Sequence, residues 1–182
     1  EAERTTSGAV PVYTAQTQHV EALVSLLYQA TDGSNLTLDP DIDSYYLMDA
    51  VFFRVPDIAQ NTSRLSNIGL AAMKSGSVTP EQMRSLIETL TLAQFQFSNL
   101  QDGLAKAVDF NATLAESLQI KEAAAATLDF LNLTRKTLIE GQDLSPAAQT
   151  AYLDAGNKAL ALQKGLSQRL LKSLDALLVV SH

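Results

Sequence analysis

The sequence predicts an all-α fold, an elongated antiparallel bundle in which long helices run up, down, up and down. Three observations support this fold class. Apolar residues recur at intervals of three and four along most of the chain, no stretch alternates apolar and polar residues as a half-buried strand does, and the breaks between periodic stretches are short. The chain has 182 residues, 46% of them apolar and 18% charged, enough for a single domain over residues 1–182 with its own core.

The first helix is expected over residues 14–32. Residues 1–13 contain Gly8 and Pro11 and follow no clean period, so we expect an irregular lead-in there. Apolar residues spaced by three and four then indicate an amphipathic helix, and Gly33 follows as a favourable C-terminal cap. The apolar positions of this helix are Val20, Leu23, Val24, Leu27 and Tyr28.

The second helix is expected over residues 39–75. Asp39 can accept hydrogen bonds from the free amides of a first helical turn, and Pro40 suits the first helical position. Pro56 falls inside the periodic pattern, and we expect it to kink the helix. The predicted buried stripe consists of Val51, Val55, Ile58, Leu65 and Ala72.

A third helical segment is expected over residues 79–140. Thr79-Pro80-Glu81-Gln82 has the residues of a capping box with proline just inside it. The apolar seam slips in phase near residues 103–111, which is compatible with a stutter in one helix or with a break. An unbroken segment would overhang its neighbours, whereas a bend would stack two bundle modules end to end. The seam consists of Met83, Leu86, Leu90, Ala93, Phe97, Leu100, Leu104 and Ala107, and then of Leu114, Leu118, Ala125, Leu128 and Leu131.

The last helix is expected over residues 145–181, beginning at Ser145-Pro146. Counted as four passes, the four helical segments place both chain ends at the same end of the bundle. The chain opens without methionine and closes on an apolar helical pattern without a stop signal, so we expect a fragment of a longer protein. The residues expected to face inward are Ala159, Leu162, Leu166, Leu170, Leu174 and Leu177.

Charge and composition argue against several classes of function. The net charge is −7, and no basic stripe is visible for nucleic acid. The absence of cysteine excludes disulfides and thiolate chemistry. The two histidines are His19 and His182, and no Gly-rich phosphate loop or nucleophile-elbow motif occurs. We therefore expect neither enzymatic activity nor a cofactor in this fragment.

Polar and aromatic chemistry is concentrated in residues 34–49, SNLTLDPDIDSYYLMD, just before the apolar run VFFRVP. The aspartates at positions 39, 41 and 43 match the first three ligands of a calcium loop. Such a loop then needs glycine at its sixth position and glutamate at its twelfth, where this chain has Ser44 and Ala50. We therefore expect no metal site, and a helix cap with favourable dipole charges explains Asp39 and Asp41 better.

A ligand-binding cluster is the sharper interpretation of this stretch. Its candidate residues are Asp43, Tyr45, Tyr46, Asp49 and Arg54. Charges within an apolar segment must be paired or must face a partner, and tyrosines make good pocket walls. The two charges at 49 and 54 are five positions apart, so they do not share one face of an α-helix. The structural alternative, in which Arg54 pairs with Asp57 and the tyrosines fill the bundle end, stays open.

The string SNLTLDPDIDSYYLMDAV, within Ser34–Pro56, resembles a segment of the extracytoplasmic regions of bacterial membrane receptors. These receptors include sensor histidine kinases and methyl-accepting chemotaxis proteins with helical-bundle sensor domains. The resemblance implies a periplasmic sensor domain held between two membrane helices that lie outside this chain, as part of an inner-membrane protein. A two-component histidine kinase is the first expectation for the parent, and a chemoreceptor is the alternative.

Partners follow from the same interpretation. We expect a homodimer, and a small molecule or a periplasmic protein of unknown identity as the signal. An alternative of another class is a structural or protein-docking bundle without a small-molecule site. In that case the segment from residue 34 to residue 57 caps the bundle end and fixes the register of the helices.

Overall fold

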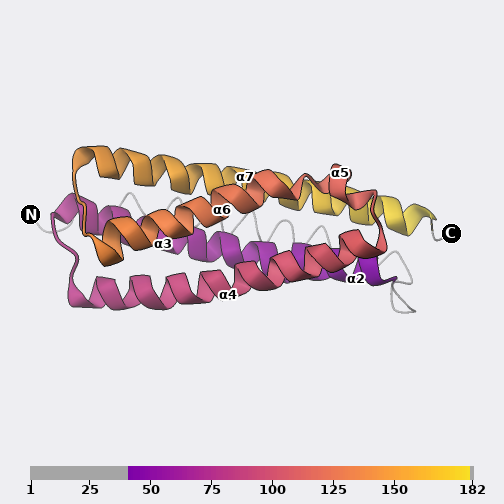
Figure 1. Ribbon diagram of the computed structural model, residues 1–182, viewed down its shortest axis with the longest axis horizontal. Helices are drawn as coiled ribbons and strands as arrows, with labels where there is room; N and C mark the ends of the chain where they lie inside the picture. The colour runs from indigo at the N-terminus through magenta and orange to yellow at the C-terminus, as the bar shows by residue number, and fades with distance from the viewer. Residues whose placement is uncertain (1–40, 181–182) are drawn as a thin grey trace, which may run out of the picture. The chain divides into compact units, whose positions relative to one another are not determined.

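The computed structural model describes residues 41–180, and this part of the chain confirms the all-α fold class (Figure 1). The predictions for residues 1–13 and 14–32, and the helix start at Asp39-Pro40, lie outside the described residues. The elements, in chain order, are α2 (Ile42–Asp49), the π-helix η1 (Ala50–Arg54), α3 (Val55–Ser75), α4 (Pro80–Phe110), α5 (Leu114–Leu118), α6 (Ile120–Thr134), the π-helix η2 (Arg135–Glu140) and α7 (Pro146–Val180).

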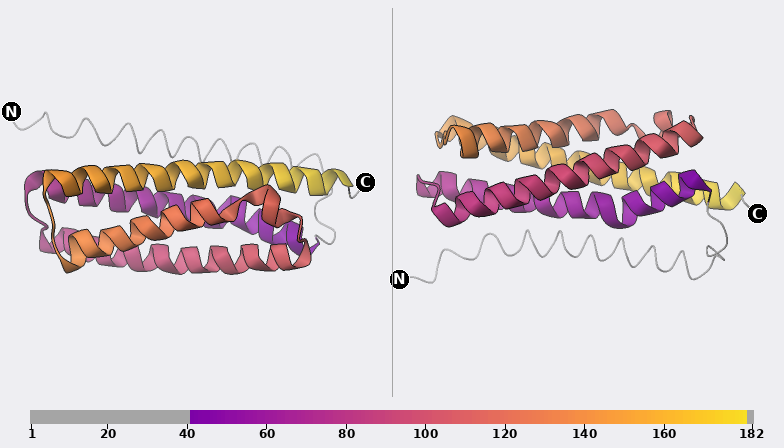
Figure 2. Two further views of the ribbon diagram at one scale, coloured as in Figure 1. Left: turned by 45° about the horizontal axis from the view of Figure 1, so that its top comes forward. Right: turned by 60° about the horizontal axis from the view of Figure 1, so that its bottom comes forward.

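These elements make four antiparallel passes along one bundle (Figures 1 and 2). The first pass is the continuous run of α2, η1 and α3, the second is α4, the third runs from α5 through η2, and the fourth is α7. Helix α3 packs against α4 and α7, and α6 packs against α7. An even number of passes brings the start of α2 and the end of α7 to the same end of this bundle.

The segment predicted over 79–140 is two passes joined by a reversal. Helix α4 continues through Gly103 and ends at Phe110, with Asn111 as its extended C-cap. Gln119 then adopts a left-handed backbone conformation, with φ of 48°, directly before α6 begins. The chain thus neither overhangs nor stacks two modules end to end, and counting this segment as one pass was wrong. The predicted count of four passes for the whole chain was therefore wrong as well, since residues 42–180 make four passes without the helix predicted over 14–32.

The reversal also explains which predicted core positions are correct. The stripe along η1 and α3 is buried as predicted, and so is the α4 seam except for the half-buried Met83. In α6, Ala125 and Leu128 are exposed, contrary to the prediction, because the left-handed residue restarts the helix in a new phase. In α7, Leu162 and Leu177 are half-buried. The residues that α6 buries are Ala123, Ala126, Thr127, Phe130, Leu131 and Thr134.

Local capping signals are confirmed where the structure describes them. The Thr79 hydroxyl accepts the Gln82 amide at 3.1 Å, and the Gln82 side chain accepts the Thr79 amide at 2.9 Å. These two bonds form the capping box that starts α4. Gly76 ends α3 with φ of 81°, a conformation that glycine adopts without steric cost.

The core is tightest where α3, α6 and α7 meet. The rings of Phe130 and Tyr152 lie 5.0 Å apart between centroids, and both side chains are fully buried. The Tyr152 hydroxyl donates to the Leu65 carbonyl at 2.7 Å. The Thr134 hydroxyl lies 3.3 Å from the Tyr152 hydroxyl oxygen. Burial raises the pKa of Tyr152, so its hydroxyl stays protonated and keeps donating at any physiological pH.

None of the helices in residues 41–180 is long and apolar enough to cross a membrane.

Candidate functional site

The first feature of the candidate site is the π-helical turn η1, Ala50–Arg54. Pro56 follows it closely and lacks an N–H, and in an α-helix its ring would crowd the carbonyl four residues back. A wider turn relieves this crowding, and the Val55 amide accordingly donates to the Ala50 carbonyl, five residues back. The effect that the sequence predicts as a kink at Pro56 is a π-helical turn immediately before it.

The π-helical turn brings Asp49 and Arg54 together. The Arg54 Nε atom lies 3.0 Å from the Asp49 Oδ2 atom, as a hydrogen-bonded ion pair. The prediction that residues five apart do not share a face was wrong, because it assumed an α-helix throughout. Both side chains are about a third exposed, at 28% for Asp49 and 36% for Arg54, so solvent weakens the pair to about 0–1 kcal/mol.

Arg54 also acts on Asp57, the partner proposed by the structural alternative. Partial burial raises the pKa of Asp57, and the positive charge of Arg54 offsets part of that rise. The ion pair itself, however, is made with Asp49. Arg54 therefore lies between two carboxylates, with its direct contact on the N-terminal one.

Asp43 ties the start of α2 to the end of α4. Its side chain is buried, with 4% of its surface exposed. One carboxylate oxygen accepts the Ser44 amide at 2.8 Å, and the other accepts the side-chain amide of Asn111 at 3.0 Å. Asn111 is the residue that ends α4, so Asp43 connects the bundle end to the chain reversal.

The two tyrosines lie differently. Tyr46 is half-buried, and a Cβ placed on Gly103 of α4 would lie 3.3 Å from its ring, so the ring lies over this glycine. The Lys106 ammonium lies 5.5 Å from the centroid of the same ring, in a cation–π contact. Tyr45 is exposed and meets Tyr46 edge to face at 5.2 Å. Gly103 therefore serves packing against α2, although the sequence suggests a helix break there.

The five predicted residues thus share one segment but make separate contacts. Asp43 and Tyr46 face α4, Asp49 and Arg54 pair with each other, and Tyr45 points outward. A small cavity in the described part lies further along the bundle, and its lining includes none of the five.

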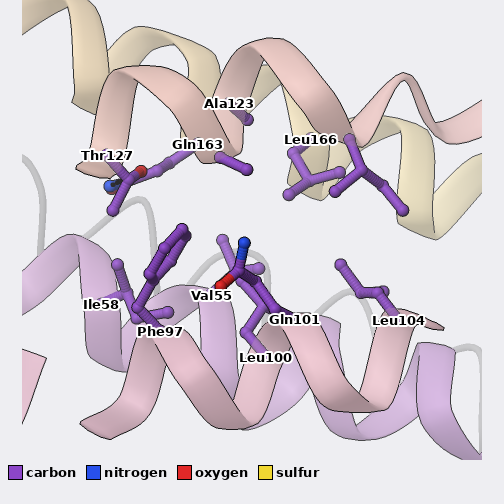
Figure 3. A pocket seen from close by; sticks show the side chains of 12 residues that line it. Val55, Ile58, Phe97, Leu100, Gln101, Leu104, Ala123, Thr127, Gln163 and Leu166 are labelled. Atoms are coloured by element: carbon purple, nitrogen blue, oxygen red, sulfur yellow. Dashed lines mark hydrogen bonds between the residues drawn. The ribbon is translucent and has the colours of Figure 1, made fainter. Parts of the chain in front are cut away.

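This cavity lies between α3, α4, α6 and α7 (Figure 3). Its volume is about 10 Å³, roughly the room that one water molecule needs. Nine of its twelve lining residues are apolar. Representative walls are Ile58 from α3, Phe97 and Leu100 from α4, Ala123 and Thr127 from α6, and Leu166 from α7.

Gln163 brings a polar group to this cavity from α7. It is 3% exposed, and its Nε2 atom donates to the Thr62 hydroxyl at 3.2 Å and to the Thr127 hydroxyl at 3.0 Å. Its Oε1 atom is buried and has no hydrogen-bond partner among the described residues. An unsatisfied buried acceptor of this kind costs about 1–3 kcal/mol.

Sequence reasoning missed this polar layer of Thr62, Thr127 and Gln163. A signal for Gln163 was present, since it lies four residues after Ala159 and three before Leu166, which puts it on the buried stripe of α7. Gln163 was missed because the predicted stripe included only apolar residues.

Across residues 41–180, no group of three or more histidine or acidic side chains is arranged to hold a metal ion. The comparisons with known proteins add no assignment to this geometry. No known protein family, no curated protein and no solved structure matches the chain.

Proposed function

We propose that the bundle of residues 42–180 is the signal-input domain of a bacterial membrane receptor, with a two-component sensor histidine kinase as the first candidate for the parent and a chemoreceptor as the second. Its place would be the periplasm, between membrane helices that lie outside this chain. The proposal draws on the resemblance carried by the segment that ends at Pro56, together with the geometry of the bundle.

The observation that carries the proposal is the position of the two ends of this bundle. Helix α2 begins and α7 finishes at the same end (Figures 1 and 2). A domain looped out on one side of a membrane needs both of its connections at the same surface, and the four passes of residues 42–180 meet this need at the start of α2 and at the end of α7. The polar and aromatic segment of α2 and η1 lies toward that end as well.

A signal would travel through the relative position of long helices. Helix α7 is 35 residues long and spans the bundle, so a shift at one end reaches the other. The hydrogen bonds of Gln163 to Thr62 and Thr127 join α7 to α3 and α6, and such buried polar layers favour particular registers. A ligand that prefers one register by a few kcal/mol would change the signalling population.

A second candidate function is a structural or protein-docking bundle without a small-molecule site. The size of the cavity, about 10 Å³, favours it, because a small-molecule pocket of ordinary size is far larger. The separate contacts of the five predicted residues favour it too. Under this reading Asp43 and Tyr46 fix the end of α2 on α4 and bind nothing else.

Ligand-dependent stabilisation separates the two functions. The full chain and its Arg54→Met variant are compared by thermal shift against small carboxylates, amino acids and aromatic acids. Under the sensor proposal, at least one compound raises the Tm of the wild type. The variant should keep nearly the same basal Tm, because its ion pair is partly exposed, but should lose that response.

Arg84→Met is the matched control, since Arg84 is an exposed arginine on α4. It should keep both the fold and the ligand response. If Arg54→Met instead unfolds the bundle, or if no compound stabilises the wild type, the structural candidate is preferred. A parent reading frame without hydrophobic helices on both sides would exclude a membrane receptor altogether.

A further inference from the structure

We infer that the buried polar layer formed by Thr62, Thr127 and Gln163 is a conformational joint, at which one half of the bundle repacks while the other half stays fixed. The near half is the part between this layer and the end where α2 begins and α7 finishes, and the far half lies on the other side of the layer. The inference does not rest on the sensor proposal, because the joint is a property of the packing.

The polar layer divides the core of the bundle in two. One cluster of ten buried apolar residues lies wholly in the far half, since its members follow Thr62 along α3 and Thr127 along α6 and η2, and precede Gln163 along α7. On α4 its members precede Gln96, whose Oε1 atom accepts the side-chain amide of Asn61 at 2.6 Å. Buried apolar residues of the near half include Val51, Val55, Ile58, Leu104, Leu118, Ala123, Leu170 and Leu174. Hydrogen bonds between side chains thus cross the bundle between two sets of buried apolar residues.

Close approaches between helices hold the far half in one arrangement. The Tyr152 hydroxyl donates to the Leu65 carbonyl at 2.7 Å and so joins α7 to α3. A Cβ atom on Gly69 would lie 2.5 Å from the same tyrosine ring, and one on Gly156 would lie 3.2 Å from the ring of Phe130. Backbones and rings that meet this closely cannot slide past one another without opening the core, so α7 is fixed against α3 and α6 in this half.

The near half is packed with more freedom. It contains the π-helical turn η1 and the small cavity, which has Thr127 and Gln163 at one end (Figure 3). The other lining residues of this cavity all belong to the near half, and all but Gln101 are apolar. Apolar side chains beside a gap of about 10 Å³ lose part of their contacts, so a change of their rotamers costs little there.

The hydrogen bonding of the layer itself favours a second packing. The Thr62 hydroxyl donates its proton to the Ile58 carbonyl at 2.8 Å, so it can only accept from Gln163. The Nε2 atom of Gln163 therefore faces the threonines, and its buried Oε1 atom has no hydrogen-bond partner among the described residues. The missing bond destabilises only the packing seen here. A rotation of the near half of α7 that brings Oε1 to water restores the bond, so the second packing lies close in free energy and is populated as a minor state.

Methyl NMR relaxation dispersion on the full chain tests the joint, because it detects minor states that exchange on the μs–ms timescale. We expect exchange at methyl groups of the near half, such as those of Leu104 and Leu170, and none at those of the far half, such as Leu65 and Leu138. Gln163→Leu removes the unsatisfied acceptor. It should therefore raise the Tm and lower the population of the minor state at least about fivefold.

Gln168→Leu is the matched control, since it makes the same change at an exposed position of α7, and it should leave the exchange as in the wild type. Gln163→Met is a second variant, whose flexible apolar side chain can fill the site if leucine does not fit. The inference is overturned if the near-half methyl groups show no exchange or if the far-half methyl groups exchange equally. It is also overturned if Gln168→Leu suppresses the exchange as well, or if both Gln163 variants lower the Tm or leave the exchange unchanged.

Discussion

At the residue scale, close approach of side chains to backbone decides what the core tolerates. Gly69 of α3 is the clearest case. A Cβ atom added there would lie 2.5 Å from the Cε1 atom of Tyr152 and 2.7 Å from the Cδ1 atom of Leu138. The absence of a side chain at Gly69 therefore lets the Tyr152 ring pack directly against α3 and donate to the Leu65 carbonyl.

Gly69→Ala should destabilise the bundle by about 1–3 kcal/mol, because a methyl group is forced into a filled core. Gly165→Ala is its control, since the added Cβ there meets only the Nη1 atom of Arg169, at 3.1 Å. The Nε atom of Arg169 donates to the Leu118 carbonyl at 2.7 Å, so the guanidinium needs to move by only a few tenths of an ångström about this bond. That change should be neutral or should stabilise by up to about 1 kcal/mol, the gain in helix propensity. Urea unfolding followed by far-UV circular dichroism measures both. Equal effects of the two changes would show that Tyr152 does not need this gap.

At the element scale, the reversal between α4 and α6 sets the topology. It spans few residues and uses a left-handed backbone at Gln119, a conformation that is unfavourable for a residue with a Cβ. The left-handed residue allows α6 to run antiparallel to α4 and to pack on α7 with a different set of buried positions. Elsewhere among residues 41–180 the left-handed conformation is adopted at Gly76 and Gln142, both in the connections between helices.

Gln119→Gly should therefore stabilise the protein by about 0.5–1 kcal/mol, because glycine adopts this conformation without steric cost. The matched control is Gln168→Gly, at an exposed position inside α7, where glycine should cost about 1 kcal/mol. Denaturant unfolding gives both values. A loss of stability in both variants would mean that the Gln119 side chain contributes more than its backbone costs.

These elements also show how far the sequence predicts the structure. The stripes of α3 and α4 and the capping box at Thr79 follow from local spacing, so they were predictable. The reversal was not predictable from local spacing. Gly103 suggests a break in the helix, whereas in the structure it makes room for the ring of Tyr46. The true end of α4 has only Asn111 as a weak stop signal.

The candidate site shows the same limit. The sequence drew attention to the residues between 43 and 54, but their partners depend on tertiary structure. Asn111, which binds Asp43, is 68 positions away along the chain. The contact between Asp49 and Arg54 depends on a π-helical turn that α-helical spacing excludes. The role of Gln163 could not be predicted, because its hydrogen-bond partners Thr62 and Thr127 lie on other helices.

At the scale of the whole molecule, the residues from 42 onward form one compact unit of the chain. Its main core cluster draws on every pass of the bundle. The members of this cluster are Leu65, Met73, Leu86, Leu90, Ala93, Phe130, Leu131, Leu138, Tyr152 and Ala159. Since these residues bury one another, the cooperative unit of folding should coincide with the bundle.

A fragment of residues 42–182 should therefore fold by itself, with helical circular dichroism and a single cooperative thermal transition. A fragment of residues 42–144, which lacks α7, should not, because α7 supplies Tyr152 and packs against both α3 and α6. The two fragments can be compared by thermal melts and by binding of a hydrophobic dye, which marks exposed core in loosely packed states. A broad, non-cooperative melt of the longer fragment would place the boundary of the folding unit elsewhere. Cooperative folding of the shorter one would mean that three passes suffice and that α7 only docks onto a core already formed.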